Sequence, residues 1–171
     1  MRVAIIMGST SDLAKVEPAI IILKEWGIQT DVRCLSAHRA YAALAKFVEE
    51  CNTNGTEAII CAAGMAAALP GVVAAQTVIP VIGVPLSASV LDGMDALMSI
   101  VQMPPSIPVA TVGINGAKNA AWLALSIIGN KHGDIKEKLI AYRQKLADDA
   151  SKTNEEIIEK FIKKLTETRD D

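Results

Sequence analysis

Aromatic side chains are scarce in this sequence. They make up 4% of the 171 residues, whereas hydrophobic residues of all kinds make up 51%. The core must therefore consist mainly of Ala, Val, Ile and Leu, a composition that favours closely packed α/β layers. Positive charge is not in excess either, because 17 Lys and Arg residues face 19 Asp and Glu residues. The resulting net charge of −2 argues against nucleic acid and anionic membranes as partners.

Cysteine and histidine are also few. The three cysteines, Cys34, Cys51 and Cys61, form no CxxC pair, and the chain has two histidines. This inventory predicts buried free thiols in a reducing cytoplasm and no metal site. The N-terminal segment lacks the length and cleavage pattern of a secretory signal peptide, which also favours a cytoplasmic location.

Residues 58–91 contain no charged side chain, and such a run is long enough to cross a bilayer. Pro70, Pro80 and Pro85 divide it into pieces that have the length of strands and short helices. We therefore interpret this segment as part of a buried sheet and not as a membrane span.

Short apolar runs alternate with helical patterns along the first 130 residues. Strands are predicted at residues 2–7, 28–34, 57–61, 80–84 and 109–114, and the continuous apolar run at 2–7 is typical of a parallel strand buried on both faces. Helices are predicted at about 11–26 with Ser11 or Asp12 as the cap, at 40–52, up to about 76, partly at 92–103, and at 117–129. This order predicts a three-layer doubly wound, flavodoxin-like parallel sheet of about five strands.

The charged residues gather near the C-terminus, where two apolar stripes predict two amphipathic helices. We therefore expect one domain over 1–171, made of an α/β core (1–130) and a C-terminal helical arm (131–171). The apolar stretch from 58 to 128 is more than one small sheet can bury, which predicts association between copies of the chain.

Ligands of an open parallel sheet bind beyond the carboxyl ends of its strands, so three loops should carry the function. The first loop, "GSTSD", offers Gly8, Ser9, Ser11 and Asp12 at the start of a helix. Backbone N–H groups and serine hydroxyls there favour an anion, and Asp12 can accept hydrogen bonds from sugar hydroxyls. The alternative is an ordinary capped turn.

The second loop, "LSAHR", brings Ser36, His38 and Arg39 to the same edge. Arginine suits a phosphate, and histidine can both donate and accept a proton near neutral pH. A solvated His38 with no function is the alternative, and His132, between two predicted helices, is expected to have none.

The third loop, "AAGMAAALPG", would let a flat ring approach Gly64, Met65, Ala66 and Leu69 closely. The alternative is tight packing between a helix and a strand. Taken together, the three loops indicate a ribose-phosphate site with a single acid/base residue.

Longer motifs carry a family resemblance. From residue 2 to about 146, the segments "MGSTSD", "SAHR", "ALPGVVAA", "PVIGVP", "LDGMDALMSIVQMPPSIPVATVGI" and "AKNAAWLA" resemble the bacterial branch of the 5-(carboxyamino)imidazole ribonucleotide mutases. The resemblance implies an isomerase of de novo purine synthesis that moves a carboxyl group from an exocyclic nitrogen to a ring carbon. It also implies a small ribonucleotide substrate, homo-octamers, and no metal, nucleotide cofactor or covalent enzyme intermediate.

The resemblance assigns roles to residues of the first two loops. The phosphate- and ribose-binding positions of the family fall on Ser9, Asp12 and Arg39, and its catalytic histidine falls on His38. Two further serine positions fall on Ser11 and Ser36. We expect His38 to protonate the exocyclic nitrogen as carbon dioxide leaves, and then to remove the proton from the recarboxylated ring carbon. The small-residue segment 63–69 would keep the gas in a dry pocket.

The sequence departs from its family at four positions. Met65 and Ala68 stand where the family usually has glycine and histidine, and Ala40 and Tyr41 follow the His-Arg pair in place of Thr-Pro. Without the second imidazole, the substrate carboxylate or carbon dioxide should be held differently, and Met65 should narrow the pocket.

Several alternatives stay open at this point. A carboxylase that uses carbon dioxide directly is one, although the Arg-Ser-Asn pattern of the animal-type branch is absent and "SIVQMP" favours the mutase. A flavodoxin-like nucleotide-binding or electron-transfer module is another, disfavoured by the few aromatics. A signal receiver would need more acidic groups than Asp12 after the first strand. Carboxylation of a pyridinium nucleotide remains compatible with Met65 and Ala68.

Overall fold

The computed structural model describes residues 1–88 and 90–167, which fall into two compact units, Met1–Lys131 and His132–Asp171. The first unit contains five strands, β1 Arg2–Met7, β2 Gln29–Cys34, β3 Thr56–Gly64, β4 Val81–Leu86 and β5 Ala110–Thr111. Its helices are α1 Leu13–Glu25, α2 Tyr41–Thr53, α3 Leu69–Ala74, α4 Met94–Val101 and α5 Ala117–Gly129, with a 3-10 turn at Thr10–Asp12. The second unit contains α6 Gly133–Glu167.

All neighbouring strands are parallel, in the order β2-β1-β3-β4-β5. This is the order of a flavodoxin-like doubly wound sheet, so the predicted fold class is confirmed. The register aligns the carboxyl ends of the first three strands, because Met7 lies opposite Cys34 on one side and Ala62 on the other. Gly64 lies opposite Leu86, which brings the end of β4 to the same edge.

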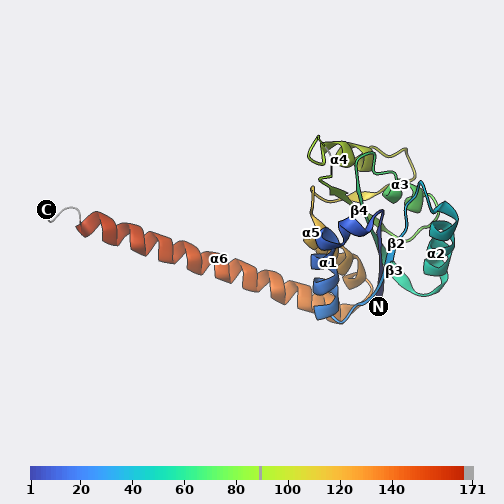
Figure 1. The fold of residues 1–171 in the computed structure, drawn as a ribbon. Helices are drawn as coiled ribbons and strands as arrows, with labels where there is room; N and C mark the ends of the chain where they lie inside the picture. Colours follow the sequence, from blue (N-terminus) through green and yellow to red (C-terminus); the bar gives the residue numbers. More distant parts are fainter. Residues whose placement is uncertain (89, 168–171) are drawn as a thin grey trace. The chain divides into compact units, whose positions relative to one another are not determined.

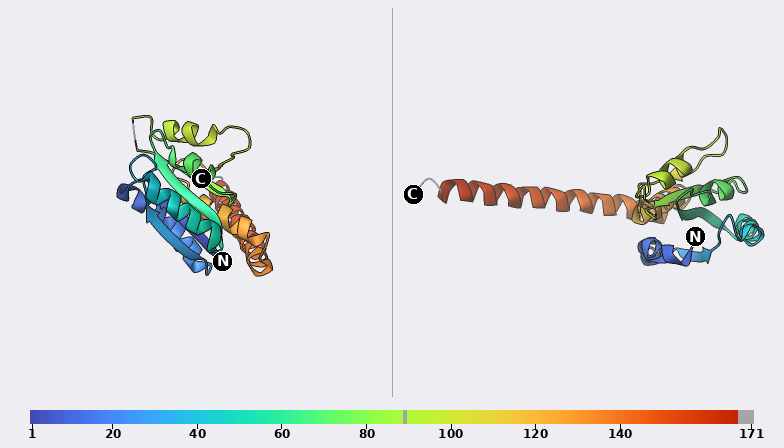
Figure 2. Two further views of the ribbon diagram at one scale, coloured as in Figure 1. Left: turned by 90° about the vertical axis from the view of Figure 1, so that its right-hand side faces the viewer. Right: turned by 45° about the horizontal axis from the view of Figure 1, so that its top comes forward.

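Helices cover both faces of the sheet, with α1 and α5 on one side (Figures 1 and 2). Successive residues of a strand point to opposite faces, and the apolar strands bury both sets of side chains. One face packs Ile6, Ile59 and Cys61 against α2, α3 and α4. Between α1 and α5, Trp26 and Trp122 meet edge to face with ring centroids 5.3 Å apart. Small and aliphatic residues therefore build the core, as the composition predicts.

The charge-free segment 58–91 supplies β3, α3 and β4 of the sheet layers. Within the described residues, no helix combines the length and the apolar character that crossing a bilayer requires.

Two of the differences from the sequence-based boundaries have a clear physical reason. The strand predicted at 57–61 continues to Gly64, because the small residues Ala62 and Ala63 pair with β4. The strand predicted at 109–114 pairs only over Ala110–Thr111, because beyond it the chain turns and Asn115 takes a positive φ of 56°. Asp12 is the N-cap residue of α1, as predicted, but its side chain forms no capping hydrogen bond there; a 3-10 turn precedes α1, and Ser9 caps that turn.

The prediction of two C-terminal helices is wrong, because α6 is one continuous helix of 35 residues. The two apolar groups are separated by residues 147–156, in which alanine is the only apolar residue type, but no Gly or Pro follows Gly133 within the helix. Polar residues without a helix breaker do not end a helix.

The cysteines are free, and the prediction that all three are buried is wrong for one of them. Cys51 and Cys61 lie in the core, where burial raises the pKa of both thiols. Cys34 is exposed, because it is the last residue of an edge strand.

Candidate functional site

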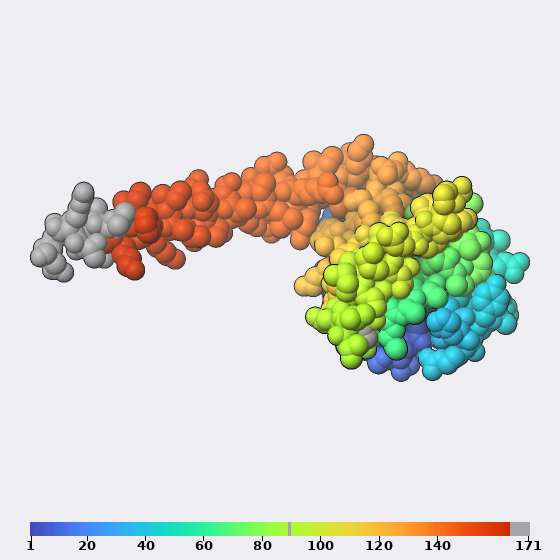
Figure 3. Space-filling model, turned by 90° about the horizontal axis from the view of Figure 1, so that it is seen from above, coloured from blue at the N-terminus to red at the C-terminus, as the bar shows by residue number. Residues whose placement is uncertain are grey.

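A pocket of about 500 Å³ lies at the carboxyl edge of the sheet, where the loops after β1, β2 and β3 meet. The segments coloured blue, light blue and green in Figure 3 come together at this edge. The structure brings all of the residues that the sequence predicted for the site to this pocket, namely Gly8, Ser9, Ser11, Asp12, Ser36, His38, Arg39, Gly64, Met65, Ala66 and Leu69. Their roles in binding and catalysis remain predictions.

The first loop is held by a reciprocal cap between Ser9 and Asp12. The Asp12 carboxylate accepts the backbone N–H of Ser9 at 3.1 Å, and the Ser9 hydroxyl accepts the backbone N–H of Ser11 at 3.4 Å. The Ser11 hydroxyl donates to the Ser9 hydroxyl at 2.9 Å. This capping box fixes the loop before any ligand binds and keeps both hydroxyls at the pocket wall.

Arg39 of the second loop forms hydrogen bonds to both the first and the second loop. Arg39 Nε donates to the Ser36 hydroxyl at 3.4 Å, and Arg39 Nη2 donates to the Gly8 carbonyl at 3.5 Å. These contacts are long and exposed, so the guanidinium can turn toward an anion at little cost. His38 is exposed and lines the same pocket, so its imidazole is accessible to a ligand there.

The third loop is strained. Met65 and Ala67 have positive φ values of 56° and 29°, a region that non-glycine residues enter at a cost of about 1–3 kcal/mol each. Backbone strain of this kind persists only where the surrounding structure enforces it, and it is often found at binding and catalytic sites. Met65 is 62% exposed, and Ala68 also lines the pocket. Both family departures of this loop therefore face the site.

Sequence reasoning missed a fourth loop at this edge. Ala88, two residues after β4, lines the pocket, and Ser87 beside it is hydrogen-bonded to Lys15 and Asn115. The sequence did contain a signal for this loop, because β4 was predicted as a parallel strand of the same sheet, and the carboxyl ends of parallel strands share one edge.

The sequence of residues 2–149 matches the family model described as AIR carboxylase. The chain belongs to this family. It is 52% identical over 143 residues to the N5-carboxyaminoimidazole ribonucleotide mutase of Pyrococcus abyssi, covering 84% of this chain and 82% of that protein. It is 51% identical over 160 residues to the protein of the same name from Methanocaldococcus jannaschii, covering 93% and 99%. The crystal structure of Treponema denticola PurE superposes with a TM-score of 0.80 at 30% identity, covering 86% of this chain and 92% of that one.

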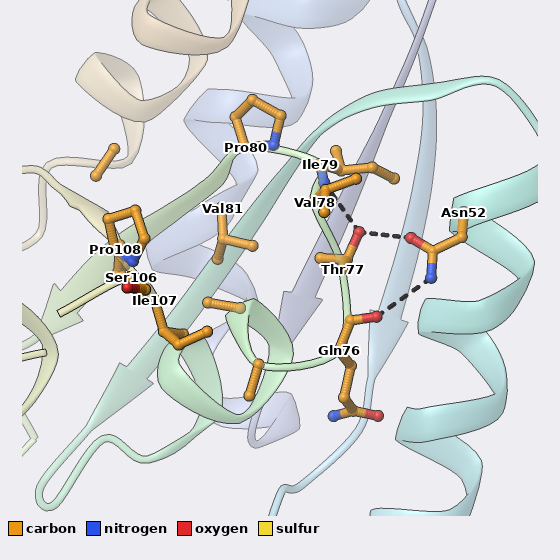
Figure 4. A pocket seen from close by; sticks show the side chains of 14 residues that line it. Asn52, Gln76, Thr77, Val78, Ile79, Pro80, Val81, Ser106, Ile107 and Pro108 are labelled. Carbon is orange, nitrogen blue, oxygen red and sulfur yellow. Dashed lines mark hydrogen bonds between the residues drawn. The ribbon is translucent and has the colours of Figure 1, made fainter. Parts of the chain in front are cut away.

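This member of the AIR carboxylase family has a second, larger pocket of about 960 Å³ (Figure 4). It lies at the opposite edge, because Val81 and Ala110, the first residues of β4 and β5, line it. A hydrogen bond from Asn52 to the Gln76 carbonyl crosses one side, and valine, isoleucine and proline form much of the rest. None of its lining residues is titratable, so it offers no acid/base chemistry and the smaller pocket is the candidate active site.

Across residues 1–88 and 90–167, no group of three or more His, Cys, Asp and Glu side chains has the spacing to hold a metal ion. Among the residues that line the smaller pocket, His38 carries the only imidazole, a group that can both donate and accept a proton near neutral pH.

Proposed function

We propose that this protein is a mutase of purine biosynthesis that converts 5-(carboxyamino)imidazole ribonucleotide to 4-carboxy-5-aminoimidazole ribonucleotide. The observation that carries the proposal is the convergence of Ser9, Ser11 and Arg39 with His38 around one pocket. Hydroxyls and a guanidinium suit a phosphate, and one imidazole suits a reaction that needs a proton given and then taken back. The names of the relatives from Pyrococcus abyssi and Methanocaldococcus jannaschii support the same reaction.

The ribose phosphate would bind between the first two loops. Arg39 would exchange its long contacts with Ser36 and Gly8 for a charge-assisted pair with the phosphate. The hydroxyls of Ser9 and Ser11 would add neutral donors, and Ser36 would be freed to donate as well. The Asp12 carboxylate would accept from a ribose hydroxyl while it keeps its bond to the Ser9 backbone.

His38 would act first as an acid and then as a base. The imidazolium gives its proton to the exocyclic nitrogen while the bond from that nitrogen to the carboxylate carbon breaks, and carbon dioxide is released. The ring carbon then attacks carbon dioxide, and neutral His38 removes the proton that this carbon carries. The enzyme ends in the protonation state in which it began, so no cofactor or co-substrate is needed.

The third loop would retain carbon dioxide between the two steps. Its pocket surface is built from Ala63, Ala66, Ala67 and Leu69, which offer no hydrogen bonds to water. A small apolar wall disfavours hydration and leaves the gas beside the ring carbon. Ala68 contributes a methyl group where an imidazole is usual in the family, so retention here depends on shape.

The assay that tests the proposal compares two substrates. We expect turnover of the carboxyamino ribonucleotide, and no carboxylation when the decarboxylated ribonucleotide is supplied with bicarbonate. Absorbance and chromatography of the carboxylated product measure both reactions. Carboxylation in the second assay would assign the protein to the carbon dioxide-using branch, and inactivity in both assays would contradict the proposal.

We also propose a homo-octamer in the cytoplasm. The free thiols suit a reducing compartment. Exposed apolar side chains support assembly, since Met94, Met98 and Val101 share one face of α4 and are about half exposed. Light scattering should give the mass of eight chains. Met98→Glu should lower this mass, whereas Thr53→Glu, at the exposed last residue of α2, should leave it unchanged. A monomeric wild-type protein would contradict this assembly.

A further inference from the structure

Two residues from distant parts of the chain hold Ser87, the first residue of the fourth loop, in place. Asn115 accepts the backbone N–H of Ser87 at 3.1 Å, and its amide donates to the Ser87 hydroxyl at 2.8 Å. Lys15 Nζ donates to the Ser87 carbonyl and lies 3.5 Å from the Ser87 hydroxyl. The N–H, the C=O and the hydroxyl of Ser87 are therefore all engaged. We call Lys15, Ser87 and Asn115 the fourth-loop clamp.

Asn115 and the backbone of Ser87 are themselves held by close contacts with neighbouring segments. Asn115 adopts a left-handed backbone with a φ of 56°, and its N–H donates to the Pro85 carbonyl at 2.8 Å. Gly93, with a φ of 88°, approaches so closely that a methyl group there would lie 3.1 Å from the Ser87 nitrogen. The backbone at Ser87 is thus fixed from several directions, which exceeds what an ordinary surface loop requires.

The next residue transmits this order to the third loop. A methyl group on Gly64 would lie 2.7 Å from Ala88 Cβ and 3.2 Å from the Leu86 carbonyl oxygen, so the two loops touch without room to spare. Directly after Gly64 come the strained positions Met65 and Ala67. A strained turn persists only where its surroundings enforce it, and Ala88, next in the chain to the clamped Ser87, lies against the residue that begins this turn.

We propose that the fourth-loop clamp is a positioning device that keeps the third loop closed over released carbon dioxide, an inference that rests on the proposed mutase function. When the clamp is loosened, Ala88 withdraws from Gly64, the strained turn relaxes and the apolar wall opens to water. Carbon dioxide then escapes after the bond from nitrogen to carbon has broken. The decarboxylated ribonucleotide is left behind, and neutral His38 regains its proton from water.

The test measures how each turnover ends. Substrate labelled in the carboxyl group gives label in the carboxylated product if the gas is retained, and labelled carbon dioxide if it escapes. In Asn115→Gly the left-handed backbone is kept and both bonds to Ser87 are lost, so we expect escape to rise roughly tenfold or more. The KM for the substrate should stay within about twofold of the wild-type value, because the proposed phosphate-binding residues of the first two loops are unchanged.

Further variants separate positioning from general loosening. Lys15→Met, which keeps the stem and removes Nζ, should also raise escape, while Asn115→Asp should restore retention because its carboxylate can accept both the N–H and the O–H of Ser87. Ser106→Gly is the matched control, since Ser106 has a φ of 76° and lies outside the residues that line the smaller pocket. Unchanged escape in both Asn115→Gly and Lys15→Met, or equal escape in Ser106→Gly, overturns the inference. A wild-type enzyme that forms no carboxylated product overturns the mutase function itself.

Discussion

His38→Asn should lower kcat by about 10²- to 10⁴-fold, the range that general acid/base catalysis contributes. Asparagine is polar and similar in size to part of the ring, but its amide neither gives nor takes a proton at neutral pH. The side chain is exposed at the pocket rim, so its removal leaves no cavity in the core. Stopped-flow or steady-state kinetics with the carboxyamino substrate measure the loss.

Two control measurements separate a loss of acid/base catalysis from a loss of substrate binding. The binding constant of the decarboxylated ribonucleotide, measured by calorimetry, should change by less than about threefold, because the proposed binding groups are in the first loop and on Arg39. His132→Asn makes the same substitution at the other histidine, which lies outside the residues that line the pocket, and should leave kcat unchanged. Turnover of His38→Asn near the wild-type rate would remove His38 from the reaction.

The sequence predicted the main elements of the fold and which residues of the first three loops gather at one pocket, but it missed Ala88 of the fourth loop. Buried strands such as 2–7 read as continuous apolar runs because helices cover both faces, and the loops after parallel strands must share an edge. That rule alone placed Ser9, His38 and Met65 in one region, although they are far apart in the chain, and all three line the same pocket.

Features that depend on long-range contacts were not predictable in this way. The clamp on Ser87 needs a hydrogen bond to Asn115, 28 residues later, and a contact from Lys15, 72 residues earlier. No local pattern records such pairings. The strain at Met65 is likewise a property of the folded loop, since a methionine at a positive φ gives no sign of itself in the sequence.

The wrong prediction of two C-terminal helices has a different cause. Two apolar groups separated by a polar stretch were interpreted as two helices, although hydrophobic periodicity reports which face of a helix is buried and not where a helix stops. Stops need Gly, Pro or a capping geometry, and α6 has no Gly or Pro after its first residue.

Arg39→Ala should raise KM for the ribonucleotide by about 10- to 100-fold and change kcat by only a few fold. A hydrogen bond to a charged group contributes about 1.5–3 kcal/mol, and the phosphate stays bound through both chemical steps, so its loss weakens substrate and transition state alike. The KM of Arg39→Lys should lie between those of the wild-type protein and Arg39→Ala, because a lysine keeps the positive charge but lacks the planar guanidinium that can form two parallel hydrogen bonds. Initial rates over a range of substrate concentrations separate the two parameters.

The matched control for this prediction is Arg33→Ala, six residues earlier in the same segment. The Arg33 guanidinium lies 4.9 Å from the centre of the Phe47 ring and does not line the pocket, so its loss should leave KM unchanged. If both alanine variants raise KM equally, the effect comes from the overall charge of this region. A large fall in kcat at constant KM in Arg39→Ala would mean that the guanidinium acts on the reacting carboxyl group and not on the phosphate.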